Sequence, residues 1–130
     1  MTTIRFYDKI IARLPQGLEA NVLRVLLAHV GAENAISLDE LTQTVLDTSN
    51  PTSDRQVREA IERLRRRGIP VLSESGRAGR WLAANREELA RCVAEMQTRA
   101  GTLQQTIAAL RRASVPFDEQ KPQHQLRIWS

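Results

Sequence analysis

Three helix-capping signals along the chain determine where most of its helices can begin. Each is a Ser or Asn followed three positions later by Glu or Gln. The side chain of the Ser or Asn can accept a hydrogen bond from a free backbone N–H group in the first turn of a helix. The signals begin at Ser37, Ser53 and Asn85. A chain punctuated in this way is predicted to be mainly helical. Its core must consist of Leu, Val, Ile and Ala, because only 4% of the residues are aromatic.

Apolar residues at spacings of three and four predict the helices between these signals. We expect helices over residues 18–30, 37–46 and 53–67, the first and third of which are each followed by a glycine. A turn-rich connector, residues 47–52, separates the second helix from the third. Residues 1–17 fit either a helix or a short strand and end in a Pro-Gln-Gly break.

A two-stranded hairpin and a long helix are predicted next. Residues 69–75 and 80–83 have the composition of strands, and a glycine stands at each end of the tip between them. The long helix is expected from Arg86 to about Arg112. The fold class is therefore mainly α-helical with a small β-hairpin. The predicted parts are an N-terminal segment 1–17, a domain 18–84, a long helix 85–113 and an extended tail 114–130.

Positive charge is concentrated in one segment of the chain. Residues 55–80 hold eight arginines and three acidic residues, a net charge of +5, whereas the whole chain carries +4. A basic patch confined to one segment is typical of a protein that binds a polyanion. The alternative is a solvated helix face, on which Glu59 and Glu62 pair with Arg63 and Arg66 four residues later.

The order helix, helix, turn, helix and basic-tipped hairpin resembles the winged helix-turn-helix superfamily. The resemblance rests on Ile36–Leu41 and Ser53–Val71, and on Ser75–Ala83, which is similar to the wing of that superfamily. It covers roughly residues 18–113, and the connector from Leu46 to Thr52 is longer than the usual tight turn. More narrowly, the chain is similar to winged-helix proteins of bacteriophages and prophages, in which a long helix follows the wing directly. The resemblance implies a protein that binds double-stranded DNA in the cytoplasm of a bacterial host.

The third predicted helix carries the candidate DNA contacts. One of its faces is apolar and the opposite face is rich in Arg, and a helix fits the major groove of B-DNA with its N-terminal residues at the base edges. We therefore expect Arg55, Gln56 and Arg58 to contact bases. Later arginines are expected at phosphates, and Arg77 at the hairpin tip in the minor groove or on the backbone. The full predicted set is Thr52, Ser53, Arg55, Gln56, Arg58, Glu59, Arg63, Arg66, Arg77 and Arg80.

An unbroken heptad pattern runs along the long C-terminal helix. Its apolar residues are spaced four and three apart, as in a coiled coil. These residues are Leu89, Val93, Met96, Ala100, Leu103, Ile107 and Leu110. The pattern predicts that two copies pair as a homodimer, and the flanking residues carry no complementary charges that would set the strand direction. The alternative is that the helix folds back onto its own domain.

The C-terminal tail holds a second candidate binding motif. Gln125, Leu126, Ile128 and Trp129 resemble the pentapeptide with which bacterial proteins bind the sliding clamp, where Gln-Leu-x-Leu-Phe is the usual form. The resemblance implies that the apolar side chains enter a hydrophobic cleft while Gln125 makes orienting hydrogen bonds. The alternative is a short strand that packs on the protein's own domain.

No group of residues has a catalytic or metal-binding spacing, so we expect neither an enzyme nor a cofactor. His29 and His124 lack partners at metal-ligand distance in the sequence, and Cys92 is expected to be a structural thiol. A single cysteine cannot form an internal disulfide, which suits a reducing cytoplasm. No apolar run approaches the roughly 20 residues that span a bilayer, so no membrane association is expected.

Two roles agree with DNA binding. The protein is predicted to be either a transcriptional regulator that binds an operator or a replication accessory protein that binds an origin and recruits host machinery through its tail. A third hypothesis belongs to another class, in which the winged helix docks on a host enzyme without binding DNA. Salt-dependent binding of duplex DNA would distinguish the first two roles from the third.

Overall fold

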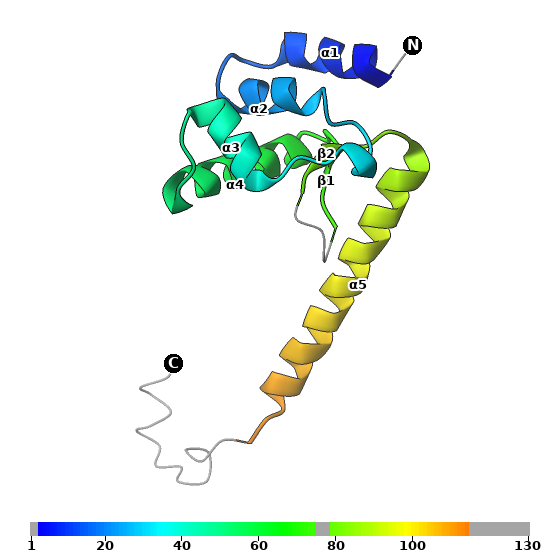
Figure 1. Cartoon of the computed structure of the whole chain (residues 1–130). Coiled ribbons are helices and arrows are strands. Elements are labelled where there is room, and N and C mark those ends of the chain that lie inside the picture. Colours follow the sequence, from blue (N-terminus) through cyan, green and yellow to red (C-terminus); the bar gives the residue numbers. More distant parts are fainter. Residues whose placement is uncertain (1–2, 75–78, 115–130) are drawn as a thin grey trace. The chain divides into compact units, whose positions relative to one another are not determined.

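The structure is a computed structural model that describes residues 3–74 and 79–114 (Figure 1). The described residues form five α-helices, one short 3₁₀ turn and an antiparallel hairpin of two strands. Residues 1–95 and 96–130 are separate compact units. In chain order the elements are α1 (Thr3–Arg13), α2 (Leu18–Leu26), η1 (Ala32–Asn34), α3 (Leu38–Leu46), α4 (Pro51–Arg66), β1 (Val71–Leu72), β2 (Trp81–Leu82) and α5 (Arg86–Arg111).

Two of the three predicted helix caps are confirmed. The Ser37 hydroxyl accepts a hydrogen bond of 3.1 Å from the backbone N–H of Glu40 at the start of α3. The side-chain oxygen of Asn85 accepts one of 2.8 Å from the backbone N–H of Glu88 at the start of α5. Each cap satisfies a backbone donor that has no partner within its own helix. The long helix accordingly begins at the predicted residue.

The third predicted cap, Ser53, is wrong by one turn. Asn50 caps α4, because its side-chain oxygen accepts a hydrogen bond of 2.9 Å from the backbone N–H of Ser53. Pro51 takes the first helical position, where its fixed φ suits a helix and its missing N–H is not needed. The connector from α3 is therefore only residues 47–50. It begins at Asp47, whose left-handed φ of 58° ends α3.

The N-terminal segment is helical, and α2 is shorter than predicted. α1 turns Tyr7 into the core. α2 ends at Leu26, four residues before the predicted end, because Val30 instead forms a parallel bridge with Leu82 of β2. The His29 carbonyl accepts a hydrogen bond of 2.9 Å from the backbone N–H of Leu82. Pairing with β2 thus stops a helix that apolar spacing alone would have continued.

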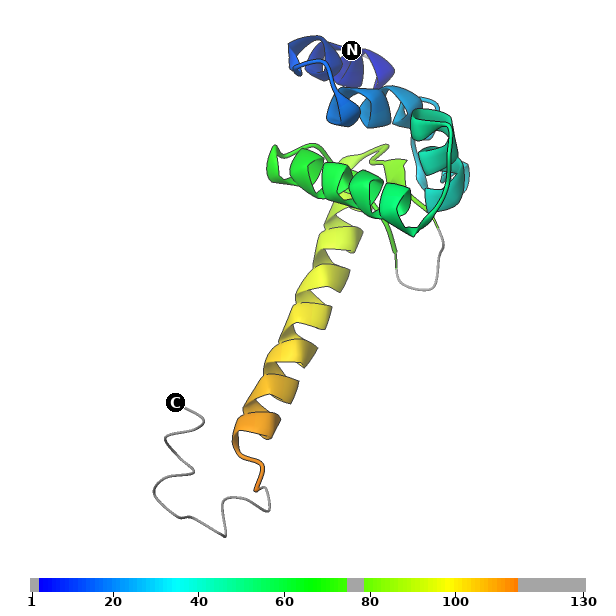
Figure 2. The ribbon, with the colours of Figure 1, turned by 90° about the vertical axis from the view of Figure 1, so that its left-hand side faces the viewer.

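The main core lies between the helices of the first unit and one face of the hairpin. Figures 1 and 2 show α2 between α1 and α4. α3 packs against both α2 and α4. The apolar face of α4 is buried as its periodicity predicts. The buried core residues are Tyr7, Val22, Leu23, Leu26, Ile36, Leu41, Val57, Ala60, Ile61, Leu64, Ile69, Val71 and Leu82.

The two strands are shorter than predicted, and their two faces pack into different apolar clusters. Val71 pairs with Leu82 and belongs to the main core, whereas Leu72 pairs with Trp81 and belongs to a second cluster with Cys92. This alternation is the ordinary period of a strand. The predicted tip, residues 76–79, lies outside the described residues except for Gly79.

A buried carboxylate joins the start of α5 to the rest of the first unit. Glu88 is 7% exposed. Its side-chain oxygens accept hydrogen bonds from the indole N–H of Trp81 (3.1 Å) and from the backbone N–H groups of Ala84 (3.1 Å) and Ala32 (3.2 Å). A charged group buried at this depth is stable only when its acceptors are satisfied in this way. One side chain therefore connects the start of η1, strand β2 and helix α5.

The second unit contains the remaining turns of α5, as far as Arg111. Leu103 is 60% exposed and Leu110 is 70% exposed. Within the described residues, no helix has both the length and the apolar character needed to cross a membrane.

Candidate nucleic-acid interface

Helix α4 presents the largest set of exposed cationic side chains in the first unit. One side of the helix is buried through Val57, Ala60, Ile61 and Leu64. The centre of the opposite, exposed side holds Arg55, Glu59, Glu62 and Arg66. Gln56 lies on one flank of this exposed side and Arg58 on the other. Exposure of the arginines is the first requirement for contact with a nucleic acid. The structure therefore meets this requirement for the predicted residues Thr52, Arg55, Gln56, Arg58, Glu59, Arg63 and Arg66.

Three arginines of this face have no carboxylate partner in the described part of the chain. Arg55, Arg58 and Arg66 form no ion pair there. Two of them lie in the N-terminal half of α4, where we predicted contacts with bases. An exposed guanidinium without a partner keeps its five donors available for an anion or for a guanine edge.

Two other arginines, one in the last turn of α4 and one just after it, share a single carboxylate of α2. Glu19 accepts from Arg63 at 3.1 Å and from Arg67 at 2.9 Å. Burial alone would raise the pKa of Glu19, but these hydrogen bonds and the charges of Arg67 and Arg63 lower it. The pairs of Glu59 with Arg63 and of Glu62 with Arg66, which the alternative of a solvated helix face predicts, are absent among the described ion pairs. Unpaired positive charge is consequently left at Arg55 and Arg58 in the N-terminal half of α4 and at Arg66 near its end.

Two members of the predicted contact set stand apart from the exposed face. Ser53 is 7% exposed, because the earlier start of α4 places it on the covered side of the first turn. We correct the prediction that its side chain contacts DNA. Arg77 lies outside the described residues.

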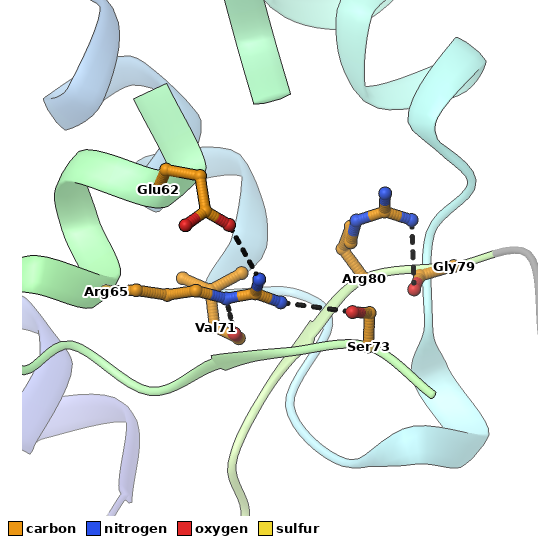
Figure 3. Close-up of polar contacts among 6 residues, drawn as sticks. All are labelled: Glu62, Arg65, Val71, Ser73, Gly79 and Arg80. Carbon is orange, nitrogen blue, oxygen red and sulfur yellow. Dashed lines mark hydrogen bonds and ion pairs between the residues drawn. The ribbon is translucent and has the colours of Figure 1, made fainter. Parts of the chain in front are cut away.

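Arg65, which was not among the predicted contact residues, attaches the hairpin to α4 (Figure 3). Its guanidinium donates to the Val71 carbonyl at 2.7 Å and to the Ser73 hydroxyl at 3.0 Å, and it pairs with Glu62 at 2.9 Å. Every nitrogen of this guanidinium has a partner, so Arg65 fixes geometry rather than offering charge. The sequence gives no signal that separates Arg65 from its neighbours Arg66 and Arg67.

Arg80 lies at the base of the hairpin, next to the position that Arg65 occupies. Its backbone pairs with Ile36 through hydrogen bonds of 2.9 and 2.8 Å. Its guanidinium is half-buried and makes one long hydrogen bond, of 3.4 Å, to the Gly79 carbonyl (Figure 3). Burial, and then the charges of Arg65 and Arg58, lower the pKa of Arg80. Three guanidinium groups thus share the junction between α4 and the hairpin.

The predicted pairing surface on α5 is partly covered in the first unit and open in the second. Val93 is 43% exposed, and Leu89 is half-buried beside the second cluster. Met96 and Ile107 are half-buried as well, whereas Leu103 and Leu110 are among the most exposed apolar residues described. The tail residues Gln125, Leu126, Ile128 and Trp129 lie outside the described residues.

The described residues contain no cluster of His, Cys, Asp and Glu that could hold a metal ion. Cys92 is buried, and burial together with the charges of Glu74, Glu88 and Glu95 raises the pKa of its thiol, although Arg91 opposes this. A reactive cysteine requires the opposite shift. His29 lies outside α2 and its ring Nδ1 is 2.7 Å from the Asn34 carbonyl, which corrects its predicted place in a helix.

Comparison of the chain with protein-family models, with curated proteins and with solved structures found no significant match.

Proposed function

We propose that residues 18–84 form a winged helix-turn-helix domain that binds double-stranded DNA, with α4 in the major groove and the hairpin as the wing. The observation that carries this proposal is the exposed face of α4. Arg55 and Arg58 in its N-terminal half, and Arg66 near its end, have no described carboxylate partner, whereas Arg63 and Arg67 share Glu19. A helix face with several unpaired guanidinium groups favours an anionic partner.

The chemistry of that face favours duplex DNA over a simple polyanion. Arg55 and Gln56 can form paired hydrogen bonds with guanine and adenine, each contributing about 1–3 kcal/mol of discrimination between bases. Glu59 lies on the same exposed face and would repel phosphates, although it can accept a hydrogen bond from cytosine. A helix that mixes Arg, Gln and Glu suits base edges in a groove better than a uniform row of phosphates.

A duplex titration tests this function. Wild-type protein should bind duplex DNA with an affinity that falls about a thousandfold or more between 50 and 200 mM salt if it makes about six phosphate contacts. The double variant Arg55→Ala/Arg58→Ala should lose at least tenfold in affinity. The matched control is Arg111→Ala/Arg112→Ala, which removes the same charge from exposed residues at the end of α5 and should bind like the wild type.

The outcomes separate DNA binding from the alternative of a protein-docking module. Equal losses in both double variants would mean that net charge, not the face of α4, governs binding. Absence of duplex binding by the wild type would overturn the proposal, and the exposed face of α4 would then be a surface for an acidic protein partner.

We also propose that α5 pairs with a second copy of the chain. The heptad pattern continues through the exposed Leu103 and Leu110, and a monomer would leave this apolar stripe in water. Sedimentation equilibrium should give a dimer for the wild type and a monomer for Leu103→Asp. Gln105→Asp adds the same charge on the opposite side of the helix and should remain dimeric. A monomeric wild type, or a dimeric Leu103→Asp, would overturn the pairing.

The motif in the tail determines which role of a DNA-binding protein we expect. We propose that Gln125–Trp129 binds a bacterial sliding clamp, which favours a function in replication over transcription control, consistent with the resemblance to phage winged-helix proteins. Calorimetry of the full chain with a purified clamp tests this, with deletion of residues 125–130 as the comparison. Binding that survives the deletion would assign any clamp contact to another surface. An absence of binding would favour the transcriptional role.

A further inference from the structure

The junction between α4 and the hairpin brings together arginines from distant parts of the chain. The register of β1 and β2 pairs Val71 with Leu82 and Leu72 with Trp81. The next residues toward the hairpin tip are Ser73 after β1 and Arg80 before β2. Both lie on the same face as Val71 and Leu82, which is the face that packs toward α4. The hydrogen bond of 3.0 Å from Arg65 of α4 to Ser73 confirms this direction (Figure 3).

Arg58 approaches the same junction from the helix. It lies seven residues before Arg65, which is two helical turns, so both side chains occupy the flank of α4 that faces the hairpin. Burial lowers the pKa of Arg80 most, and the charges of Arg65 and Arg58 lower it further. The three guanidinium groups are therefore close enough to interact although they come from two elements.

The charges at this junction are not balanced within the described chain. Glu62 neutralises Arg65, each of whose three guanidinium nitrogens makes a hydrogen bond. Arg58 and Arg80 form no described ion pair, and the Arg80 side chain donates, among the described residues, only the long bond to Gly79. Glu74, an acidic residue of the hairpin, lies on the opposite face, because successive strand residues point to opposite sides. On that face its charge raises the pKa of Cys92. Arg58 and the half-buried Arg80 are thus left at this junction without a described carboxylate partner.

We propose that Arg58 and Arg80 together bind a single phosphate group beside Arg65, which fastens β1 to α4. Arg58 then contacts a phosphate rather than the base edge predicted from the sequence. The ligand class is a phosphate monoanion or dianion, and on duplex DNA the site would hold one backbone phosphate between the helix and the wing. The binding of a phosphate group does not depend on the proposed function. Only the statement that this phosphate belongs to duplex DNA rests on the proposed DNA-binding function. Two guanidiniums on one phosphate make charge-assisted, directional bonds, which a diffuse basic surface does not.

The first experiment uses inorganic phosphate alone, so it does not depend on DNA binding. The side-chain Nε–Hε resonances of the arginines are followed by NMR as phosphate is added to the full chain. We expect the signals of Arg58 and Arg80 to saturate together with one dissociation constant, while that of Arg66 changes little. Arg80→Gln should abolish the saturable change at Arg58, whereas Arg66→Gln should leave it intact. Similar, non-saturating changes at all exposed arginines would overturn the site.

The second experiment measures the salt dependence of duplex binding. Each phosphate contact contributes about −0.9 to the slope of log affinity against log salt. Arg58→Gln and Arg80→Gln should each lower the magnitude of the slope by about one. If both residues hold the same phosphate, the double variant should also lower it by only about one. A decrease of about two would mean separate phosphates and would overturn the shared site.

The two experiments distinguish failure of the inference from failure of the function. Saturable phosphate binding without duplex binding would retain the site and reject the DNA-binding proposal. Duplex binding that is unaffected by either substitution would retain the function and reject the site. Because Arg58 is exposed and makes no described contact that the fold needs, Arg58→Gln tests the site even if substitution of Arg80 disturbs the hairpin.

Discussion

The hydroxyl of Tyr7 in α1 donates a hydrogen bond of 2.9 Å to the backbone carbonyl of Ala83, which lies 76 residues further along the chain. Both residues are buried, and the ring of Phe6 contacts that of Tyr7 edge-on at 5.3 Å between centroids. This bond attaches the N-terminal helix to the end of β2. It explains why a segment with an ambiguous sequence pattern adopts one position in the fold.

Alkaline pH should destabilise the first unit through Tyr7. Burial, and then the charge of Glu88, raises the pKa of Tyr7 to about 12, whereas an unfolded tyrosine titrates near 10. A raised pKa stabilises the fold below the unfolded pKa, and this contribution is lost as pH rises from about 10 to 12. We expect a loss of roughly 1–3 kcal/mol in the free energy of unfolding over that range.

Urea unfolding at a series of pH values measures this loss, and Tyr7→Phe should not show it. Tyr7 is the single tyrosine of the chain, so tyrosinate absorbance reports its ionisation directly. Ionisation near pH 10 in the folded protein would contradict the prediction.

Glu88→Gln should destabilise the first unit by about 1–3 kcal/mol. The substituted amide can keep one acceptor oxygen for Trp81 and Ala84, but its NH₂ group would face the backbone N–H of Ala32. Two donors would then oppose each other in a buried place. Thermal unfolding followed by circular dichroism measures the effect. Glu87→Gln, at the exposed neighbouring position, is the control and should unfold like the wild type.

Gly79→Ala should destabilise the base of the hairpin, by about 1–3 kcal/mol. A Cβ atom at this position would lie 2.9 Å from the Cβ of Ala35, which cannot rotate away because it is attached directly to the backbone. The double variant Gly79→Ala/Ala35→Gly removes that contact and should recover most of the loss. Chemical denaturation of the two single variants and the double variant measures the coupling. Independent, additive effects would show that the close approach is not the cause.

Thr42→Val should stabilise the protein, by about 1 kcal/mol. The Thr42 side chain is fully buried in α3, and its hydroxyl has no hydrogen-bond partner among the described residues. Valine has nearly the same shape and removes a polar group that is costly to bury. Thr44→Val is the matched control in the same helix, because the exposed Thr44 hydroxyl donates to the Glu40 carbonyl at 2.7 Å. A destabilised Thr42→Val would indicate that the hydroxyl has a partner in solution.

Local signals in the sequence predicted most helix starts but not the contacts between elements. Ser37 and Asn85 cap helices as predicted, because a cap depends on neighbouring residues only. The end of α2 depends on Leu82, more than fifty residues away, and was therefore predicted too late. At α4 a second local signal, Asn50 followed by Pro51, overrode the one at Ser53.

In the candidate site, too, local features were predicted from the sequence but contacts between elements were not. Helical periodicity correctly separated the buried face of α4 from its exposed arginines. Arg63, Arg65 and Arg66 look equivalent in the sequence, yet α2 pairs with the first, the hairpin binds the second and the third has no described ion pair. Which arginine is available to a ligand depends on Glu19 and on strand β1, and only the folded structure brings these beside α4.

Strand β2 also determines when the domain can complete its folding. Its backbone pairs with β1 on one edge and with Val30 on the other, and Arg80 just before it pairs with Ile36. The residue that follows β2 accepts the hydrogen bond from Tyr7. During synthesis from the N-terminus, α1 to α4 leave the ribosome before residues 80–83 exist. The helices can contact one another by then, but the core is completed only by residues 80–83, whose arrival closes several long loops in one step. A chain that ends before residue 80 would therefore retain helical segments that lack a common closing strand and are prone to aggregate.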